Sequence, residues 1–194
     1  FCALYPFYLQ YLAQLTRAEA ARIAAQPGPS GLPLPGRLDA IALLADFAAL
    51  ADSEMQGRRA GQPGMVKART YLQQRFAAIG LEPAGRDGYL HTYQATPGRF
   101  DDKAVIGVNL IGRIAGTDPT LKPIVLTAHY DHLGEHQGRI YHGADDNASG
   151  VAAMLALAQY LKSQPLRHPV LVIALDHEEQ GMQGAAALFD SGLL

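Results

Sequence analysis

The strongest constraint on the fold is the order of apolar and amphipathic runs in residues 124–175. A short apolar run, 124–128, is followed by helically spaced apolar residues over 149–162 and by a second apolar run, 170–175. A strand, a crossover helix and a second strand form a βαβ unit, which brings the ends of two parallel strands to one edge of a sheet. We therefore expect an α/β domain in which the residues that follow these strands lie close together.

Polar signatures stand at three places in this segment. HYDHLG follows the first apolar run, HGADDNASG precedes the helical pattern, and DHEEQG follows the second run. Open α/β sheets bind their ligands at the carboxyl ends of their strands. A site that holds a divalent metal and activates water needs histidine and carboxylate ligands, together with one carboxylate that stays free as a base. The three signatures supply these groups, and we interpret them as a two-metal hydrolase site.

Each signature also has a purely structural explanation. Residues 145–147 can be a turn and helix cap, because Asp, Asn and Ser accept hydrogen bonds from free amides. Residues 178–179 can be a charged first turn that is favoured by the helix dipole. A His-x-Asp sequence is common on protein surfaces. These explanations leave unexplained why all the signatures occur in this order directly beside β-like runs, which favours the metal site.

The three signatures resemble those of the co-catalytic zinc aminopeptidase family. That family also contains glutaminyl-peptide cyclases, glutamate carboxypeptidases and the catalytically silent transferrin-receptor ectodomain. The resemblance continues upstream through residues 55–85 and covers about 50–190. It implies a three-layer α/β sandwich of the phosphorylase/hydrolase type, with a mixed, mostly parallel β-sheet flanked by helices.

The resemblance also implies a role for each matching residue. His129 matches the first zinc ligand, and Asp131 matches the carboxylate that steadies this histidine. Asp146 matches the carboxylate that bridges both metals, and the peptide bond after it is expected to be cis. Glu178 matches the general base, and Glu179 matches a ligand of the second metal. Two zinc ions per complete domain are implied as cofactors.

From this resemblance we predict a zinc-dependent exopeptidase, most specifically an aminopeptidase, with peptides as substrates. Glu178 would activate a water that bridges the metals. Two alternatives remain open: a glutaminyl-peptide cyclotransferase on the same scaffold, and a non-catalytic interaction domain of the transferrin-receptor kind. The intact set of base and ligands speaks against the second alternative.

Other histidines of the chain are expected to play lesser parts. His132, His136 and His142 are predicted to be loop or pocket-rim residues rather than ligands. His91 lies in an alternating strand pattern and is expected to be exposed. His177 directly precedes the base, which allows a pocket or supporting role.

The remaining elements follow from the spacing of apolar residues and from turn signals. The expected elements are a helix from 38 to the polar turn 57–64, a helix over 63–80, strands over 89–95 and 105–114, and a last helix over 181–189. Gly80 is placed to end the second helix. The strands before residue 115 form an antiparallel pair, which makes the sheet mixed, whereas 124–128 is expected to be a short buried strand.

Composition limits the partners and the number of domains. A chain of 194 residues with 48% hydrophobic content can form one domain with a sizeable core. A formal net charge of -2 gives no electrostatic footprint for nucleic acid, so no nucleic-acid partner is expected. The single cysteine, Cys2, excludes an intrachain disulfide and leaves the compartment open.

Residues 1–37 are expected to be an appendage to the domain. The run 1–15 is apolar but too short and interrupted for a convincing membrane span, and 27–37 is a Pro/Gly-rich connector. The run is either the tail of a signal or anchor segment, which places the protein near a membrane, or an amphipathic helix packed on the domain. The expected location is secreted, periplasmic or membrane-anchored facing outward.

One departure from the family concerns the end of the chain. The family's two remaining metal ligands, an Asp and a His, follow the Glu-Glu pair, whereas this sequence reaches Leu194 within the next helix. We therefore interpret 38–194 as the N-terminal portion of a catalytic domain whose C-terminal portion is absent or supplied by another chain. The 194-residue polypeptide alone is expected to be inactive and to self-associate through an open sheet edge.

Overall fold

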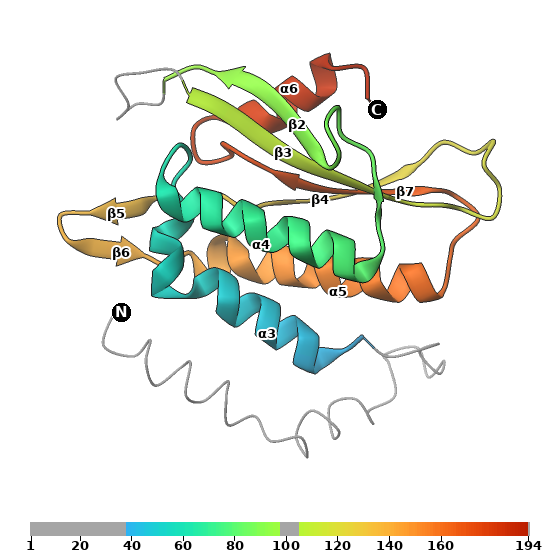
Figure 1. The fold of residues 1–194 in the computed structure, drawn as a ribbon, viewed down its shortest axis with the longest axis horizontal. Coiled ribbons are helices and arrows are strands. Elements are labelled where there is room, and N and C mark those ends of the chain that lie inside the picture. The colour runs from blue at the N-terminus through green and yellow to red at the C-terminus, as the bar shows by residue number, and fades with distance from the viewer. Residues whose placement is uncertain (1–37, 98–104, 194) are drawn as a thin grey trace.

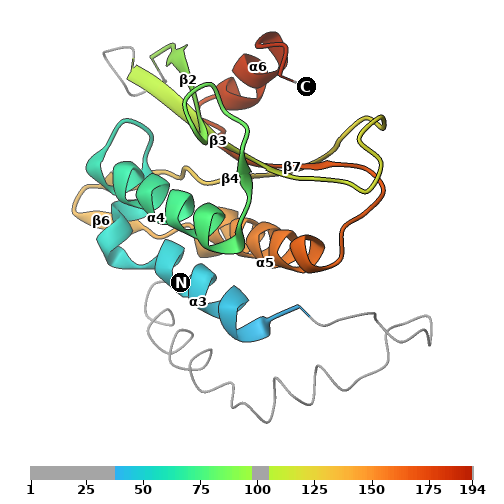
Figure 2. The same ribbon diagram turned by 45° about the vertical axis from the view of Figure 1, so that its right-hand side comes forward.

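The computed structural model describes residues 38–97 and 105–193 (Figure 1). The predicted N-terminal segment and connector, 1–37, lie outside the described residues. A mixed sheet of five strands has the order β1 (Glu82–Pro83), β3 (Val105–Ile114), β7 (Val170–Leu175) and β4 (Ile124–His129), and β2 (Leu90–Ala95) also pairs with β3. Helices α3 (Ala40–Ala51), α4 (Pro63–Ile79) and α5 (Ser149–Ser163) lie on one face of this sheet, and α6 (Gln183–Asp190) lies on the other (Figures 1 and 2). The expected α/β fold, a mixed sheet flanked by helices, is confirmed.

The helices begin and end where local chemistry favours it. Their bounds are α3 Ala40–Ala51, η1 Ser53–Arg58, α4 Pro63–Ile79, η2 Ala144–Ala148, α5 Ser149–Ser163 and α6 Gln183–Asp190. Asp39 caps α3, because its carboxylate accepts hydrogen bonds from the amides of Ile41 and Ala42 at 3.0 Å. Gly80 ends α4 in the left-handed conformation, as predicted.

The strands form the predicted βαβ unit. Their bounds are β1 Glu82–Pro83, β2 Leu90–Ala95, β3 Val105–Ile114, β4 Ile124–His129, β5 Gly134–His136, β6 Arg139–Tyr141 and β7 Val170–Leu175. Strands β4 and β7 are parallel and in register from Ile124 opposite Val170 to His129 opposite Leu175. Among the described residues, the other pairs of the main sheet are antiparallel, so this part of the sheet is mixed as predicted but not mostly parallel. The carboxyl ends of β4 and β7 therefore lie side by side.

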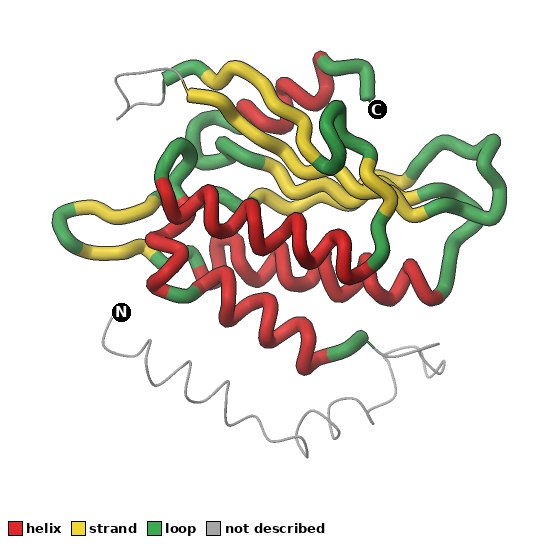
Figure 3. Tube along the Cα trace, viewed as in Figure 1, coloured by secondary structure: helices red, strands yellow, loops and turns green. Residues whose placement is uncertain are grey.

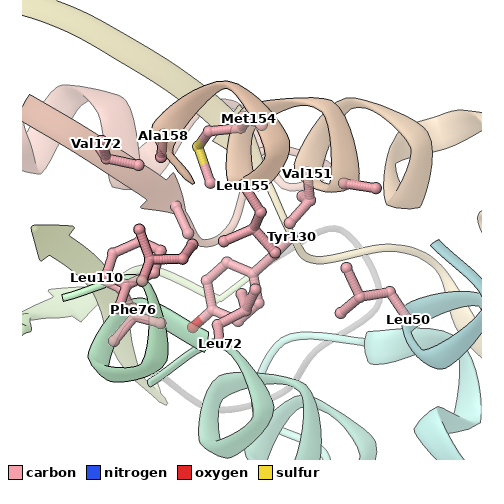
Figure 4. Packing of buried hydrophobic residues seen from close by; sticks show 14 of the residues in the cluster. Leu50, Leu72, Phe76, Leu110, Tyr130, Val151, Met154, Leu155, Ala158 and Val172 are labelled. Carbon is pink, nitrogen blue, oxygen red and sulfur yellow. The ribbon is translucent and has the colours of Figure 1, made fainter. Parts of the chain in front are cut away.

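The main core fills the space between the sheet and helices α3 to α5 (Figure 4). Leu72 and Phe76 of α4 are fully buried there, as are Val151 and Leu155 of α5. Helical spacing in the sequence predicts these positions correctly. A smaller cluster packs against α6 on the opposite face of the sheet, and it comprises Ile111, Leu171, Ile173 and Leu188. Helix and strand layers are thus tied together on both faces (Figure 3).

The first apolar run differs from its prediction. Strand β4 was expected to be buried, yet Ile124 is 45% exposed and Val125 is 42% exposed. Within the described residues β4 pairs with β7 alone, so its other edge has no neighbouring strand. A continuous apolar run indicates a buried strand only when both faces of that strand are covered, and the start of β4 is exposed here.

Strands β5 and β6 pair with each other and form a small hairpin that extends away from the main sheet (Figures 1 and 3). None of the described helices is long and apolar enough to cross a membrane.

Candidate metal centre

The predicted site residues converge at the shared end of β4 and β7. His129 is the last residue of β4, and Glu178 and Glu179 follow β7 after a short turn. Asp146 lies in η2, directly before α5, and its carboxylate Oδ1 is 3.1 Å from His129 Nε2. The strand ends and the helix start therefore bring these residues together, as the βαβ pattern predicts.

The peptide bond between Asp146 and Asn147 is cis. The resemblance to the zinc aminopeptidases implied this bond, and the expectation is confirmed. The side-chain Oδ1 of Asn147 accepts a hydrogen bond from Gly150 N, in the first turn of α5, at 3.1 Å.

His132 lies closer to the centre than predicted. Its Nδ1 is 2.6 Å from Glu179 Oε1. His132, Asp146 and Glu179 each offer one ligand atom, and these atoms all lie within 4.8 Å of one another. The prediction that His132 is a loop or rim residue is therefore incomplete, because the chain after β4 turns back and brings this imidazole into the carboxylate cluster.

Asp131 supports the site through the main chain. Its carboxylate is 1% exposed and accepts hydrogen bonds from the amides of Glu178 at 3.0 Å and Glu179 at 3.2 Å. The same carboxylate is 3.6 Å from His129 Nδ1, which is too long for a hydrogen bond, while the Asp131 carbonyl oxygen is 3.3 Å from that nitrogen. Asp131 thus joins the turn after β7 to the end of β4.

The electrostatic surroundings of His129 favour a cation. Burial disfavours the charged imidazole, yet the net pKa of His129 lies above its ordinary value because nearby carboxylates favour the imidazolium. These carboxylates belong to Asp131, Glu178 and Asp146. A negative environment that retains a proton on an imidazole also favours a divalent metal ion.

The donor set suits zinc. Imidazole nitrogens and carboxylate oxygens are usual zinc ligands, and a catalytic zinc takes three protein ligands and leaves a position open. The group of His132, Asp146 and Glu179 offers three such donors, and His129 Nε2 lies 3.1 Å from Asp146 Oδ1. The Asp146 side chain is 62% exposed, so the centre is open to solvent and substrate.

Comparison with known proteins agrees with this geometry. The model of peptidase family M28 matches residues 109–192, which contain all the predicted site residues. The alkaline phosphatase isozyme conversion protein of Escherichia coli is 30% identical over 145 residues, which make up 68% of this chain and 41% of that protein. The chain is similar to peptidase family M28 over this segment. The predicted resemblance to a family of peptidases is thereby confirmed.

Solved structures share the M28 fold. The glutaminyl cyclase of Fimbriiglobus ruber is 23% identical, with a TM-score of 0.60, and the match covers 78% of this chain and 49% of that chain. A Zn-dependent exopeptidase of Parabacteroides distasonis is 22% identical, with a TM-score of 0.58, over 75% of this chain and 49% of that chain. At these identities the likeness establishes a common fold. The chain spans about half of each structure and less than half of the E. coli relative.

A buried network of hydrogen bonds holds the turn that carries Glu178 and Glu179. The carboxylate of Asp176 accepts a hydrogen bond from Val108 N at 2.9 Å, and Asp176 N donates to Asn109 Oδ1 at 3.0 Å. Asn109 Nδ2 donates to Gly184 O at 2.8 Å and lies 3.1 Å from His91 Nδ1. These bonds fasten the turn after β7 to β3.

Two histidines close to this turn, His91 and His177, are buried. His91 is 2% exposed, so the prediction that it is exposed is wrong. His91 lies on the face of β2 that α6 covers, whereas Thr92 and Gln94 on the other face are exposed. His177 is fully buried, with its Nδ1 3.2 Å from the Tyr93 hydroxyl, so it supports the turn rather than lining an open pocket.

Proposed function

We propose that this protein is a zinc-dependent exopeptidase, most specifically an aminopeptidase. The observation that carries the proposal is that Asp146 lies beside two sets of donors. Its Oδ1 is 3.1 Å from His129 Nε2, and one of its carboxylate oxygens lies within 4.8 Å of ligand atoms of His132 and Glu179. This placement supports Asp146 as a ligand that two metal ions share, with His129 and Glu179 as ligands of one ion each.

Glu178 is proposed as the general base. Its amide is held by Asp131, whereas no hydrogen bond or ion pair occupies its carboxylate among the described residues. Its neighbour Glu179 is engaged by His132, so adjacent carboxylates have different surroundings. This difference supports one carboxylate as a ligand and the other as a free proton acceptor.

The chemistry follows from these positions. Zinc bound at this centre would acidify a water molecule and polarise the carbonyl of the scissile peptide bond. Glu178 accepts the proton of the attacking water while the water oxygen bonds to the carbonyl carbon. When the carbon–nitrogen bond breaks, Glu178 delivers that proton to the leaving amine. His129 and Glu179 would hold zinc and take no part in the proton transfer.

A glutaminyl-peptide cyclotransferase is the second candidate. The shared fold with the Fimbriiglobus ruber glutaminyl cyclase favours it specifically. In that reaction the substrate's own amine attacks its side-chain amide and ammonia leaves, so no water is consumed. The free carboxylate of Glu178 could serve as base in either reaction.

One assay separates the two functions. The full-length protein, rather than the 194-residue polypeptide alone, is loaded with zinc and incubated with an unblocked peptide, with its N-acetylated form and with a peptide that begins with Gln, and the products are identified by mass spectrometry. An aminopeptidase releases free amino acids from the unblocked peptide and leaves the acetylated form intact. Loss of ammonia from the Gln peptide, with no free amino acid, would instead assign the cyclotransferase. Turnover of none of the peptides would contradict both and support an interaction domain.

We also propose that the protein acts outside the cytoplasm, where it is secreted, periplasmic or anchored and facing outward. The apolar run of residues 1–15 supports this location. Fractionation of the producing cells, with detection by an antibody against the M28 segment, tests the proposal. Recovery in the soluble cytoplasmic fraction alone would overturn it.

A further inference from the structure

A buried arginine lies beneath the loops that carry the proposed ligands. Arg58 is the last residue of η1 and is 1% exposed. Its Nε donates to Tyr130 O at 3.0 Å, and its Nη1 donates to His142 O at 2.8 Å and to Leu50 O. Its Nη2 donates to Gly143 O at 2.8 Å. One side chain therefore bonds the end of α3, the end of β4 and the loop before η2.

These acceptors stand next to the metal centre in the sequence. Tyr130 lies between His129 and Asp131, and Gly143 opens the turn that leads to Asp146. The main-chain oxygen of Arg58 also accepts a hydrogen bond from His132 N at 3.1 Å. Arg58 thus touches the two segments whose separation decides whether His129 and Asp146 can share a metal.

The packing around this side chain leaves no room for adjustment. A Cβ atom on Gly143 would lie 2.6 Å from Arg58 Nη2 and 2.5 Å from His132 Cδ2. Gly143 also has a φ of 56°, a conformation that glycine adopts readily and other residues avoid. The guanidinium of Arg58 and the loop at Gly143 are therefore in tight contact, so a shift of one would displace the other.

We propose that Arg58 is a positioning residue of the metal centre. Its planar guanidinium fixes the distance between the end of β4 and the loop that carries Asp146, so that His129 and Asp146 face one another before metal binds. A buried guanidinium is costly unless its N–H groups are satisfied, and carbonyl oxygens of three segments satisfy them here. This proposal rests on the proposed function, because it assumes that these residues hold a metal.

Arg58→Lys is the decisive variant. Lysine keeps the positive charge but offers one compact ammonium group, which cannot hold the separated carbonyls in a fixed plane. The matched control is Arg75→Lys. Arg75 joins α4 to α3 through Asp46, with Nε 2.7 Å from Oδ1, and contacts none of the proposed ligands. Both variants remove a guanidinium from a partly or fully buried contact, but only one of them lies at the metal loops.

The first readout is the zinc dissociation constant of each protein, measured by competition with a chromophoric chelator well below its unfolding temperature. We expect Arg58→Lys to weaken zinc binding by about tenfold or more, the usual effect of removing a group that orients metal ligands. Arg75→Lys should lower the unfolding temperature while zinc affinity stays near that of the parent protein. Unchanged affinity in Arg58→Lys, or an equal loss in both variants, would overturn the proposal.

The second readout needs no metal. Amide hydrogen exchange of the metal-free protein should be faster at His132 and Ala148 in Arg58→Lys and unchanged there in Arg75→Lys, because the Ala148 amide bonds Gly143 O at 3.0 Å. If the parent protein binds no zinc but exchange still changes, the proposed function fails and the positioning role stands. If zinc binds and neither readout changes, the positioning role fails and the function stands.

A measurement on the parent protein covers the case in which Arg58→Lys does not fold. The side-chain Nε–H of Arg58 should give a slowly exchanging NMR signal that shifts when zinc is added, since its acceptor lies between His129 and Asp131. A signal that does not respond to saturating zinc would contradict the role of Arg58.

Discussion

Contacts with the turn after β7 orient the residues of the proposed metal centre. Asp131 accepts the amides of both acidic residues, so a single buried carboxylate sets the direction in which Glu178 and Glu179 leave the strand. His132 then engages one member of that pair and leaves the other free. The different roles proposed for Glu179, as ligand, and Glu178, as base, thus follow from main-chain geometry as much as from residue type.

Replacement of His132 by Ala tests its place among the ligands. We expect the zinc affinity of His132→Ala to fall by about tenfold or more, because Glu179 loses its partner and the ion loses a nearby donor. Chelator competition measures the effect. His168→Ala is the control, because His168 is an exposed loop residue whose Nδ1 bonds Lys122 O. Equal zinc affinities for the two variants would show that His132 is a loop or rim residue, as the sequence predicts, and not a ligand.

Sequence patterns predict the proposed ligands better than the residues that orient them. His129, Asp146 and Glu179 stand in short polar signatures beside apolar runs, so their convergence could be predicted. The contact of His132 with Glu179 depends on how the chain turns after β4, and Arg58 acts on main-chain oxygens far away in sequence. Neither has a local pattern, because carbonyl acceptors are present at every residue.

At the scale of elements, the centre depends on the βαβ unit and on the helices that support it. The unit was predicted from apolar spacing and carries the sheet edge where the ligands meet. The exposure of β4 was not predicted, because exposure depends on which strands lie beside it. On the helical face, α3 and α4 are joined by a polar cluster in which the Tyr71 hydroxyl donates to Asp46 Oδ1 at 2.5 Å.

This cluster predicts a loss of stability at alkaline pH. Burial, followed by the hydrogen bond to Asp46 and its charge, raises the pKa of Tyr71 above its ordinary value. The folded protein therefore keeps the phenol protonated, whereas the unfolded chain releases the proton above about pH 10. The contribution is complete below that pH, and the free energy of unfolding should fall as pH rises beyond it.

Urea unfolding of the parent protein and of Tyr71→Phe between pH 8 and about pH 11 measures this effect. Tyr71→Phe should lose less stability over this interval than the parent does. It should not become independent of pH, since burial also raises the pKa of Tyr93 and Tyr130. Parallel pH profiles for the two proteins would show that Tyr71 does not contribute.

At the scale of the whole molecule, the exposed edge of β4 is the feature with the clearest consequence. An apolar edge strand offers unpaired main-chain groups to any other strand, and natural proteins protect such edges with charges or with covering segments. Ile124 and Val125 carry no such protection within the described residues.

We predict that the 194-residue polypeptide self-associates in a concentration-dependent way and that Val125→Lys reduces the association. A lysine on the edge opposes pairing with another strand. Val66→Lys is the control, because Val66 is 49% exposed on α4, where the helix satisfies the main chain. Sedimentation velocity over a range of concentrations provides the measurement. A monomeric parent polypeptide, or an equal effect of both lysines, would contradict the prediction.

The central claim is that the end of β4 and β7 binds zinc and that Glu178 acts there as the base. The most direct test uses the full-length protein and its Glu178→Gln variant, and it measures zinc content and turnover of an aminoacyl substrate in the same preparations. Glutamine keeps the shape of the side chain but cannot accept the proton, so we expect turnover to fall by about 100-fold or more while bound zinc stays unchanged. Turnover equal to that of the parent at equal zinc content would contradict the account.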